Sequence, residues 1–274
     1  MLRSSRRRRR KQDRSRKILG LSLIGVAIAI VVAGTLYWYD ARNSLVELDP
    51  STLCPKSGPR SVTVVLLDRT DPLAVVQQAD LHNQLETLVA EIPRYGELTI
   101  YSVEPVEERP LVPRYTMCNP GEGKDIDPTI GNPTMVQGRW ETGFRAPLDA
   151  VLAELIAPTE EPTSPIMESI QSLAITTFGE RNRREAHGRL VVVSDLMQHT
   201  AGYSQYRDKG PYDGFKRTAY FRRVQADLKG VEVELLYVRR DVQIRYGAAA
   251  HIEFWESYFR DQGAQLVRVR ALPG

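Results

Sequence analysis

The sequence contains little of what hydrolytic and phosphate-binding enzymes need. It has only four histidines, and none is spaced as in the HExxH pair of zinc proteases. Their positions support no Ser-His-Asp arrangement, and the spacing of a phosphate-binding P-loop is absent. These absences exclude the enzyme classes that those motifs define.

Positive charge is scarce outside the N-terminus. The whole chain has a net charge of +3, but residues 1–17 hold ten Arg or Lys and one acid, which gives +9. The remaining residues hold 27 basic and 33 acidic side chains, a net −6. Nucleic-acid binding needs Lys and Arg clustered on the folded body, so we expect no nucleic-acid partner.

One stretch lacks charge altogether. Ile18 to Tyr37 is a run of twenty uncharged residues, and Trp38 and Tyr39 follow it. A helix of that length spans the roughly 30 Å hydrocarbon core of a bilayer. We therefore predict a transmembrane helix over residues 18–39, a cytoplasmic tail over residues 1–17, and an exported C-terminal part. The alternative is a cleaved signal peptide, although its apolar region is usually only about 7–15 residues long.

Cysteine is nearly absent. The two cysteines, Cys54 and Cys118, both lie in the part predicted to be exported. We predict a disulfide between them; the alternative is two unrelated buried thiols. The one Asn-x-Thr triplet has a proline in the middle, so no glycosylation acceptor occurs. A bacterial inner-membrane protein with a periplasmic domain fits these features.

The rest of the chain alternates between strand and helix patterns. We predict a linker over residues 40–60 and one domain over residues 61–274, with a long insertion at 104–142 that has room for a short edge strand. The expected strands are residues 61–67, 97–103, 188–194, 231–238 and 265–272, and the expected helices are 72–92, 145–156, 164–178, 215–228 and 248–262. This order predicts a three-layer α/β fold with a mostly parallel central sheet and helices on both faces.

Polar residues follow two of the predicted strands. Asp68 and Thr70 come after the first strand, and Asp195 comes after the strand at 188–194. Ser164 begins the helix between them in the chain. Carboxyl ends of parallel strands line a common crevice, and carboxylate and hydroxyl oxygens suit a hard cation such as Mg²⁺. We therefore predict that oxygen-bearing side chains from these loops converge on one crevice that suits such a cation.

The order of these motifs resembles a von Willebrand factor type A (vWA) domain with its metal-ion-dependent adhesion site. Asp68 and Thr70 match the first two positions of the family's Asp-x-Ser-x-Ser motif, Ser164 resembles its Thr, and Asp195 matches its last Asp. The resemblance implies that these four residues are metal ligands that hold Mg²⁺, or Mn²⁺ or Ca²⁺, with a free position completed by an acidic residue of a partner. Pro72 stands at the third motif position and offers no hydroxyl, so the site is degenerate.

Helix capping is the alternative explanation for the same residues. Asp68 or Asp71 before Pro72 is a helix start signal, and Ser164 before Pro165 is another. Asp195 would likewise cap the segment that follows its strand. Capping accounts for each residue singly but not for their common placement at the strand ends.

Other side chains near the crevice are candidates for partner binding. We predict this role for Asp71, His199, Tyr203 and Tyr206, because exposed tyrosines on a loop suit protein recognition. The alternative is that the tyrosine rings pack beneath the loop.

The sequence therefore favours a membrane-anchored, non-catalytic module that binds another protein of a membrane or periplasmic complex through its strand ends, with or without a divalent cation. One alternative is a metal-dependent phosphatase of the haloacid-dehalogenase type with Asp68 as nucleophile, although Thr70 stands where that family has its second Asp. Another is a purely structural subunit of a membrane complex.

Overall fold

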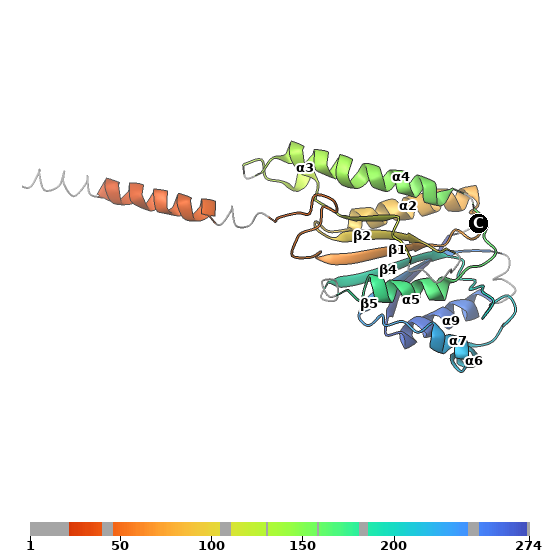
Figure 1. Cartoon of the computed structure of the whole chain (residues 1–274). Coiled ribbons are helices and arrows are strands. Elements are labelled where there is room, and N and C mark those ends of the chain that lie inside the picture. Colours follow the sequence, from red (N-terminus) through yellow and green to blue (C-terminus); the bar gives the residue numbers. More distant parts are fainter. Residues whose placement is uncertain are drawn as a thin grey trace, which may run out of the picture. The chain divides into compact units, whose positions relative to one another are not determined.

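The computed structural model of the chain describes residues 22–39, 46–104, 111–129, 131–157, 159–180, 186–240 and 247–272 (Figure 1). The chain divides into two compact units, Met1–Glu47 and Leu48–Gly274. The first contains an apolar helix, Ser22–Tyr39, which has a mean hydropathy of 1.8 and is long enough to cross a membrane. The predicted cytoplasmic tail and the first residues of the predicted membrane span lie outside the described residues.

A six-stranded sheet forms the centre of the second unit. Its strands are β1 (Ser61–Leu67), β2 (Glu97–Ser102), β3 (Tyr115–Cys118), β4 (His187–Ser194), β5 (Val231–Val238) and β6 (Gln265–Leu272). They are arranged in the order β3-β2-β1-β4-β5-β6, and every neighbouring pair is parallel except β2 and β3. The mostly parallel sheet is confirmed, and the edge strand expected in the insertion is β3.

Helices cover both faces of the sheet, as Figure 1 shows. One face carries α5 (Ile166–Thr176), α9 (Ala248–Asp261) and two short helices, α6 (Tyr212–Lys216) and α7 (Ala219–Arg223); the other carries α2 (Val75–Glu91) and α4 (Ala146–Ile156), with η1 (Gly123–Asp125), α3 (Pro133–Arg139) and η2 (Trp140–Arg145) in the chain before α4. The predicted three-layer α/β fold is therefore confirmed.

The central strand β1 shows why this sequence builds a buried sheet. Val62, Val64 and Leu66 point into the core beneath α5 and α9, whereas Val65 and Leu67 point into the core beneath α2 and α4. A strand that is covered on both faces is mostly apolar, and β1 is apolar at every position except Ser61 and the buried Thr63.

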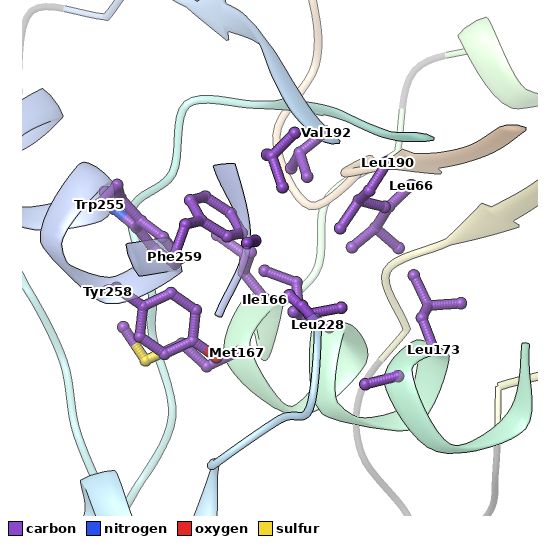
Figure 2. Close-up of a cluster of buried hydrophobic side chains, with 14 of the residues drawn as sticks. Leu66, Ile166, Met167, Leu173, Leu190, Val192, Leu228, Trp255, Tyr258 and Phe259 are labelled. Atoms are coloured by element: carbon purple, nitrogen blue, oxygen red, sulfur yellow. The ribbon is translucent and has the colours of Figure 1, made fainter. Parts of the chain in front are cut away.

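The larger of the two cores is built around aromatic rings. Trp255, Tyr258 and Phe259 of α9 are fully buried and pack toward Ile166 and Met167 of α5 (Figure 2). Residues three and four apart lie on the same face of a helix, so α9 presents one continuous aromatic surface to the sheet.

Two predicted helices differ from the structure. In place of one helix over 215–228, the structure has the two short helices α6 and α7 over 212–223, because Thr218 caps α7 by accepting a hydrogen bond from the backbone N–H of Phe221 at 3.1 Å. The helix expected from Pro72 begins at Val75, and its N-cap residue is Ala74.

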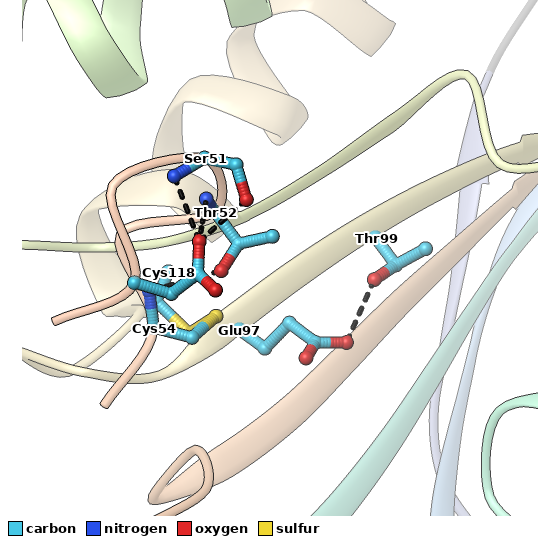
Figure 3. Close-up of a disulfide and its surroundings, with 7 residues drawn as sticks. Ser51, Thr52, Cys54, Glu97, Thr99 and Cys118 are labelled. Carbon is cyan, nitrogen blue, oxygen red and sulfur yellow. Dashed lines mark hydrogen bonds between the residues drawn. A yellow bond between two sulfur atoms is a disulfide. The ribbon is translucent and has the colours of Figure 1, made fainter. Parts of the chain in front are cut away.

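The predicted disulfide is present in the structure. Cys54 and Cys118 are bonded, which ties the segment before β1 to β3 at the edge of the sheet (Figure 3). The backbone N–H of Cys118 also donates to the carbonyl of Thr52 at 2.8 Å, and the side chain of Leu53 is buried. Residues 48–60 therefore pack on the domain, although the sequence predicts a linker over 40–60.

Candidate functional site

The carboxylate of Asp68, at the carboxyl end of β1, is the centre of the candidate site. Its Oδ1 accepts from the backbone N–H of Thr70 at 3.0 Å and from the Thr70 hydroxyl at 2.7 Å. Its Oδ2 accepts from the hydroxyls of Ser164 at 3.1 Å and Ser194 at 2.7 Å. Asp68 thus joins segments that are more than 90 residues apart in the chain.

Asp195 lies at the end of the neighbouring strand β4. Strands β1 and β4 are parallel, and the backbone N–H of Asp68 donates to the carbonyl of Val193 at 2.8 Å. The side chain of Asp195 is only 6 % exposed, and its Oδ1 accepts from the backbone N–H of Met197 at 2.9 Å. The structure therefore brings the predicted residues Asp68, Thr70, Ser164 and Asp195 to one edge of the sheet.

Arg240, just after β5, reaches the same edge. Its Nε lies 3.7 Å from Oδ2 of Asp195. Its Nη1 donates to the carbonyl of Pro72 at 2.7 Å, and its Nη2 donates to the carbonyl of Asp71 at 3.2 Å. A guanidinium group thus links the loop after β1 to the carboxylate after β4.

Burial and charge shift the acid–base behaviour of this edge. Burial, reinforced by the negative charge of Asp68, raises the pKa of Asp195 to about 7. Burial together with the carboxylates of Asp195, Asp71 and Asp68 raises the pKa of Tyr206 to about 12. Tyr206 therefore lies within electrostatic range of the carboxylates of Asp68, Asp71 and Asp195.

The four predicted partner-binding residues fall into two groups. Asp71 is exposed, Tyr206 is 40 % exposed, and His199 is half-buried with its ring against that of Tyr206. Tyr203 is only 5 % exposed and packs against Phe215 and Tyr220. Its ring lies under the loop, so we withdraw it from the surface set.

The backbone of His199 has a structural role beside the site. His199 and Ser164 exchange two backbone hydrogen bonds, at 2.8 and 2.9 Å. This isolated bridge fixes the segment before α5 against the loop after β4. The Ser164 hydroxyl is thereby held where it donates to Asp68.

Helix capping does not explain the arrangement. Neither Asp68 nor Asp71 caps α2, which begins after Ala74, and Ser164 precedes Pro165, the N-cap residue of α5. The side chain of Asp195 accepts from Met197 in a loop and not at the start of a helix. The common placement at the strand ends is what the capping alternative leaves unexplained.

The donor set fits a divalent cation only in part. Carboxylate and hydroxyl oxygens are the right chemistry for Mg²⁺. However, Pro72 supplies no hydroxyl, Asp68 already accepts four hydrogen bonds, and the positive charge of Arg240 lies beside Asp195. Because Mg²⁺ needs a nearly ideal octahedron of ligands, these features weaken the predicted metal site.

Among the described residues, one group of three potential metal-ligating side chains lies close together, and it is at the disulfide and not at the candidate site. Cys54, Glu97 and Cys118 have their ligand atoms within 4.8 Å of one another. Because both cysteines are in the disulfide, they offer no thiolate to a metal.

Two residues of the site are missing from the prediction. Ser194 is the last residue of β4, and its hydroxyl points back to Asp68. Arg240 follows β5, the strand on the far side of β4. The rule that placed Asp68 and Asp195 at strand ends applies equally to residues just after β5. The same rule could therefore have placed Arg240 near the site.

No protein-family model and no curated protein matches the sequence. Among solved structures, the chain is similar to the VWA domain of SpRpn10, with 8% identity, a TM-score of 0.38, and coverage of 78% of this chain and 88% of that one. It is also similar to the conserved hypothetical protein BatB from Bacteroides thetaiotaomicron, with 12% identity, a TM-score of 0.37, and coverage of 77% and 91%.

Proposed function

We propose that this protein is a membrane-anchored interaction module without catalytic activity of its own. The helix Ser22–Tyr39 anchors the chain, and the domain from Leu48 onward binds another protein of the membrane or periplasm. The contact surface is the edge of the sheet where β1 and β4 end, around Asp68 and Asp195.

One observation carries this proposal. Polar side chains from three separate segments meet at one sheet edge, and beside them lie the exposed carboxylate of Asp71 and the exposed ring of Tyr206. A partly buried polar network holds the loops in place, so the exposed groups are presented in a fixed arrangement. Tyrosine combines a large contact area with a hydroxyl, which is why it is frequent at the centres of protein interfaces.

The hydrogen bonds of Asp68 argue against the phosphatase alternative. Each of its two oxygens accepts two hydrogen bonds from its own chain, so both are engaged before any substrate arrives. The general acid of that mechanism would have to be Thr70, whose side chain is 5 % exposed and donates to Asp68.

The cellular location belongs to the same proposal. A basic tail before an apolar helix favours a cytoplasmic N-terminus, and a disulfide favours an oxidising compartment for the domain. A bacterial inner-membrane protein with its domain in the periplasm satisfies both conditions.

Substitutions of the exposed groups test the proposed contact surface. The full chain is purified from solubilised membranes of its source organism, and the proteins that copurify with the wild type, Asp71→Arg and Tyr206→Glu are quantified. We expect either substitution to reduce the recovery of the specific partner about tenfold or more, the effect of losing one interface hot spot.

The matched control is His187→Glu. His187 is exposed and lies at the amino end of β4, the opposite edge of the sheet. It should leave recovery unchanged. Equal recovery with all four proteins would refute the proposed surface.

A further inference from the structure

Arg240 lies beside Asp195, one of the four residues predicted to hold a metal ion. Its guanidinium donates to the carbonyls of Asp71 and Pro72 and lies 3.7 Å from the carboxylate of Asp195. Its side chain is 24% exposed, and that of Asp195 is 6% exposed. The charge pair is therefore largely withdrawn from water. A buried ion pair is screened less than an exposed one.

The end of β5 is held firmly against the start of α2. The side chain of Gln77, which is buried, donates from Nε2 to the carbonyl of Arg239 at 3.0 Å and accepts from the backbone N–H of Ala74 at 3.1 Å. These contacts fix the residue before Arg240 beside the loop that carries Asp71 and Pro72. The backbone that carries Arg240 is consequently held in place where the side chain enters the crevice.

Arginine suits this place for chemical reasons. The guanidinium is planar, stays charged at every physiological pH, and presents several N–H groups in a fixed fork. Here the fork spans two successive carbonyls and a carboxylate. One of those carbonyls belongs to Pro72, which stands at the third position of the motif, where the family has its second serine.

We propose that Arg240 is the built-in cation of this site, and that the crevice consequently takes up no divalent metal ion. The guanidinium supplies positive charge to an edge that carries Asp68, Asp71 and Asp195. A divalent ion close to Asp195 would be repelled by it, and the site would also lack the hydroxyl ligand that Pro72 replaces. This inference concerns the charge balance of the site and holds whether or not the proposed partner binds there.

Two arms of one stability experiment test this. Thermal unfolding of the full chain in detergent micelles at about pH 8, above the raised pKa of Asp195, is followed for the wild type, Asp195→Asn, Arg240→Gln and the double variant. This comparison of variants is the first arm. The second, the metal arm, adds Mg²⁺ or Mn²⁺ at about 10 mM, because an ion bound only by the native state raises Tm. The control is Arg260→Gln, which removes an exposed pair with Glu256.

We expect the metals to shift the Tm of the wild type no more than that of Asp195→Asn. Arg240→Gln should lower Tm by about 5 °C or more, because it leaves a buried carboxylate without its counter-charge. The loss should be at least halved in the Asp195→Asn background, and Arg260→Gln should change Tm little.

A Tm that rises with metal in the wild type but not in Asp195→Asn would overturn the proposal. So would an Arg240→Gln variant that is as stable as the wild type, or a loss of equal size in both backgrounds. The metal arm needs no change at Arg240, so it decides whether the crevice takes up a divalent metal ion even if the Arg240→Gln variant does not fold.

Discussion

At the scale of single residues, Leu196 shows how the site is shaped. It directly follows Asp195, is fully buried, and has a left-handed backbone with φ of 61°. A bulky residue in that region costs on the order of 1–3 kcal/mol, so surrounding contacts have to maintain it. Ser194 accepts from its backbone N–H at 2.7 Å, and Trp255 donates to its carbonyl at 3.0 Å. The turn after β4 is therefore held from both sides.

His251 lies beneath that turn and makes stability depend on pH. Burial lowers the pKa of the imidazole to about 4, and its ring nitrogens contact Tyr237 at 2.8 Å and Gln205 at 3.3 Å. Because the folded pKa is below the ordinary value of 6.5, this residue's stabilising contribution is complete above pH 6.5 and is lost as the pH falls toward 4. We expect it to remove about 3 kcal/mol from the free energy of unfolding over that interval.

The measurement is chemical denaturation between pH 7 and pH 4, comparing the wild type with His251→Gln. Asp195 acts in the opposite direction, because its pKa is raised to about 7 and its contribution grows as the pH falls. The difference between wild type and variant isolates the histidine, and His82→Gln, an exposed histidine, is the control. Parallel pH profiles for the wild type and His251→Gln would contradict the assignment.

Residue roles were predictable only where the chain itself marks them. Asp68 and Asp195 are marked because each directly follows an apolar strand. Tyr203 and Tyr206 lie three residues apart in an irregular loop, so no periodicity shows that the first is buried and the second exposed. The position of Arg240 just after β5 could be read from the same rule, but its contact with Asp195 depends on the packing of β5 beside β4, which the sequence does not specify.

At the scale of elements, strands were more predictable than helix ends. The predicted bounds of β1, β5 and β6 agree with the structure, because apolar β-branched runs between polar turns mark strands clearly. The break between α6 and α7 was missed, because the hydrophobic spacing continues through Thr218 and only the cap interrupts the helix. Three-dimensional packing also decides that residues 48–60 lie on the domain.

The disulfide should contribute strongly to the stability of the domain at its outermost strand, β3. Cys54 and Cys118 are 64 residues apart in the sequence, and the bond links the segment before β1 to β3. In the chain-entropy model, removing a cross-link of this span lowers the free energy of unfolding by about 4 kcal/mol. We expect this loss in denaturant titrations of the double variant Cys54→Ala, Cys118→Ala.

Reduction provides an independent check on the same quantity. A reducing agent should lower the denaturation midpoint of the wild type to about that of the double variant, and it should leave the double variant unchanged. If the midpoint of the wild type stayed constant while both thiols became titratable, the bond would contribute no stability.

At the scale of the whole molecule, the chain combines an apolar helix with an α/β domain whose candidate site is built from segments that are distant in the sequence. The sequence predicted the two parts and the layers of the domain, because both follow from hydrophobic patterns. Strand order also predicted that Asp68 and Asp195 lie close together, and the structure places them at the ends of neighbouring strands. The resemblance implies a divalent cation at these strand ends, whereas the structure has the guanidinium of Arg240 beside Asp195.

The central claim is that the edge formed by the ends of β1 and β4 touches a partner protein. The most direct measurement is photocrosslinking in cells of the source organism, with a photoreactive phenylalanine analogue placed at Tyr206 or, as the control, at His187. We predict a specific crosslinked protein from position 206, absent from position 187 and lost when Asp71→Arg is added. Crosslinks to the same protein from position 187 and none from position 206 would contradict the account.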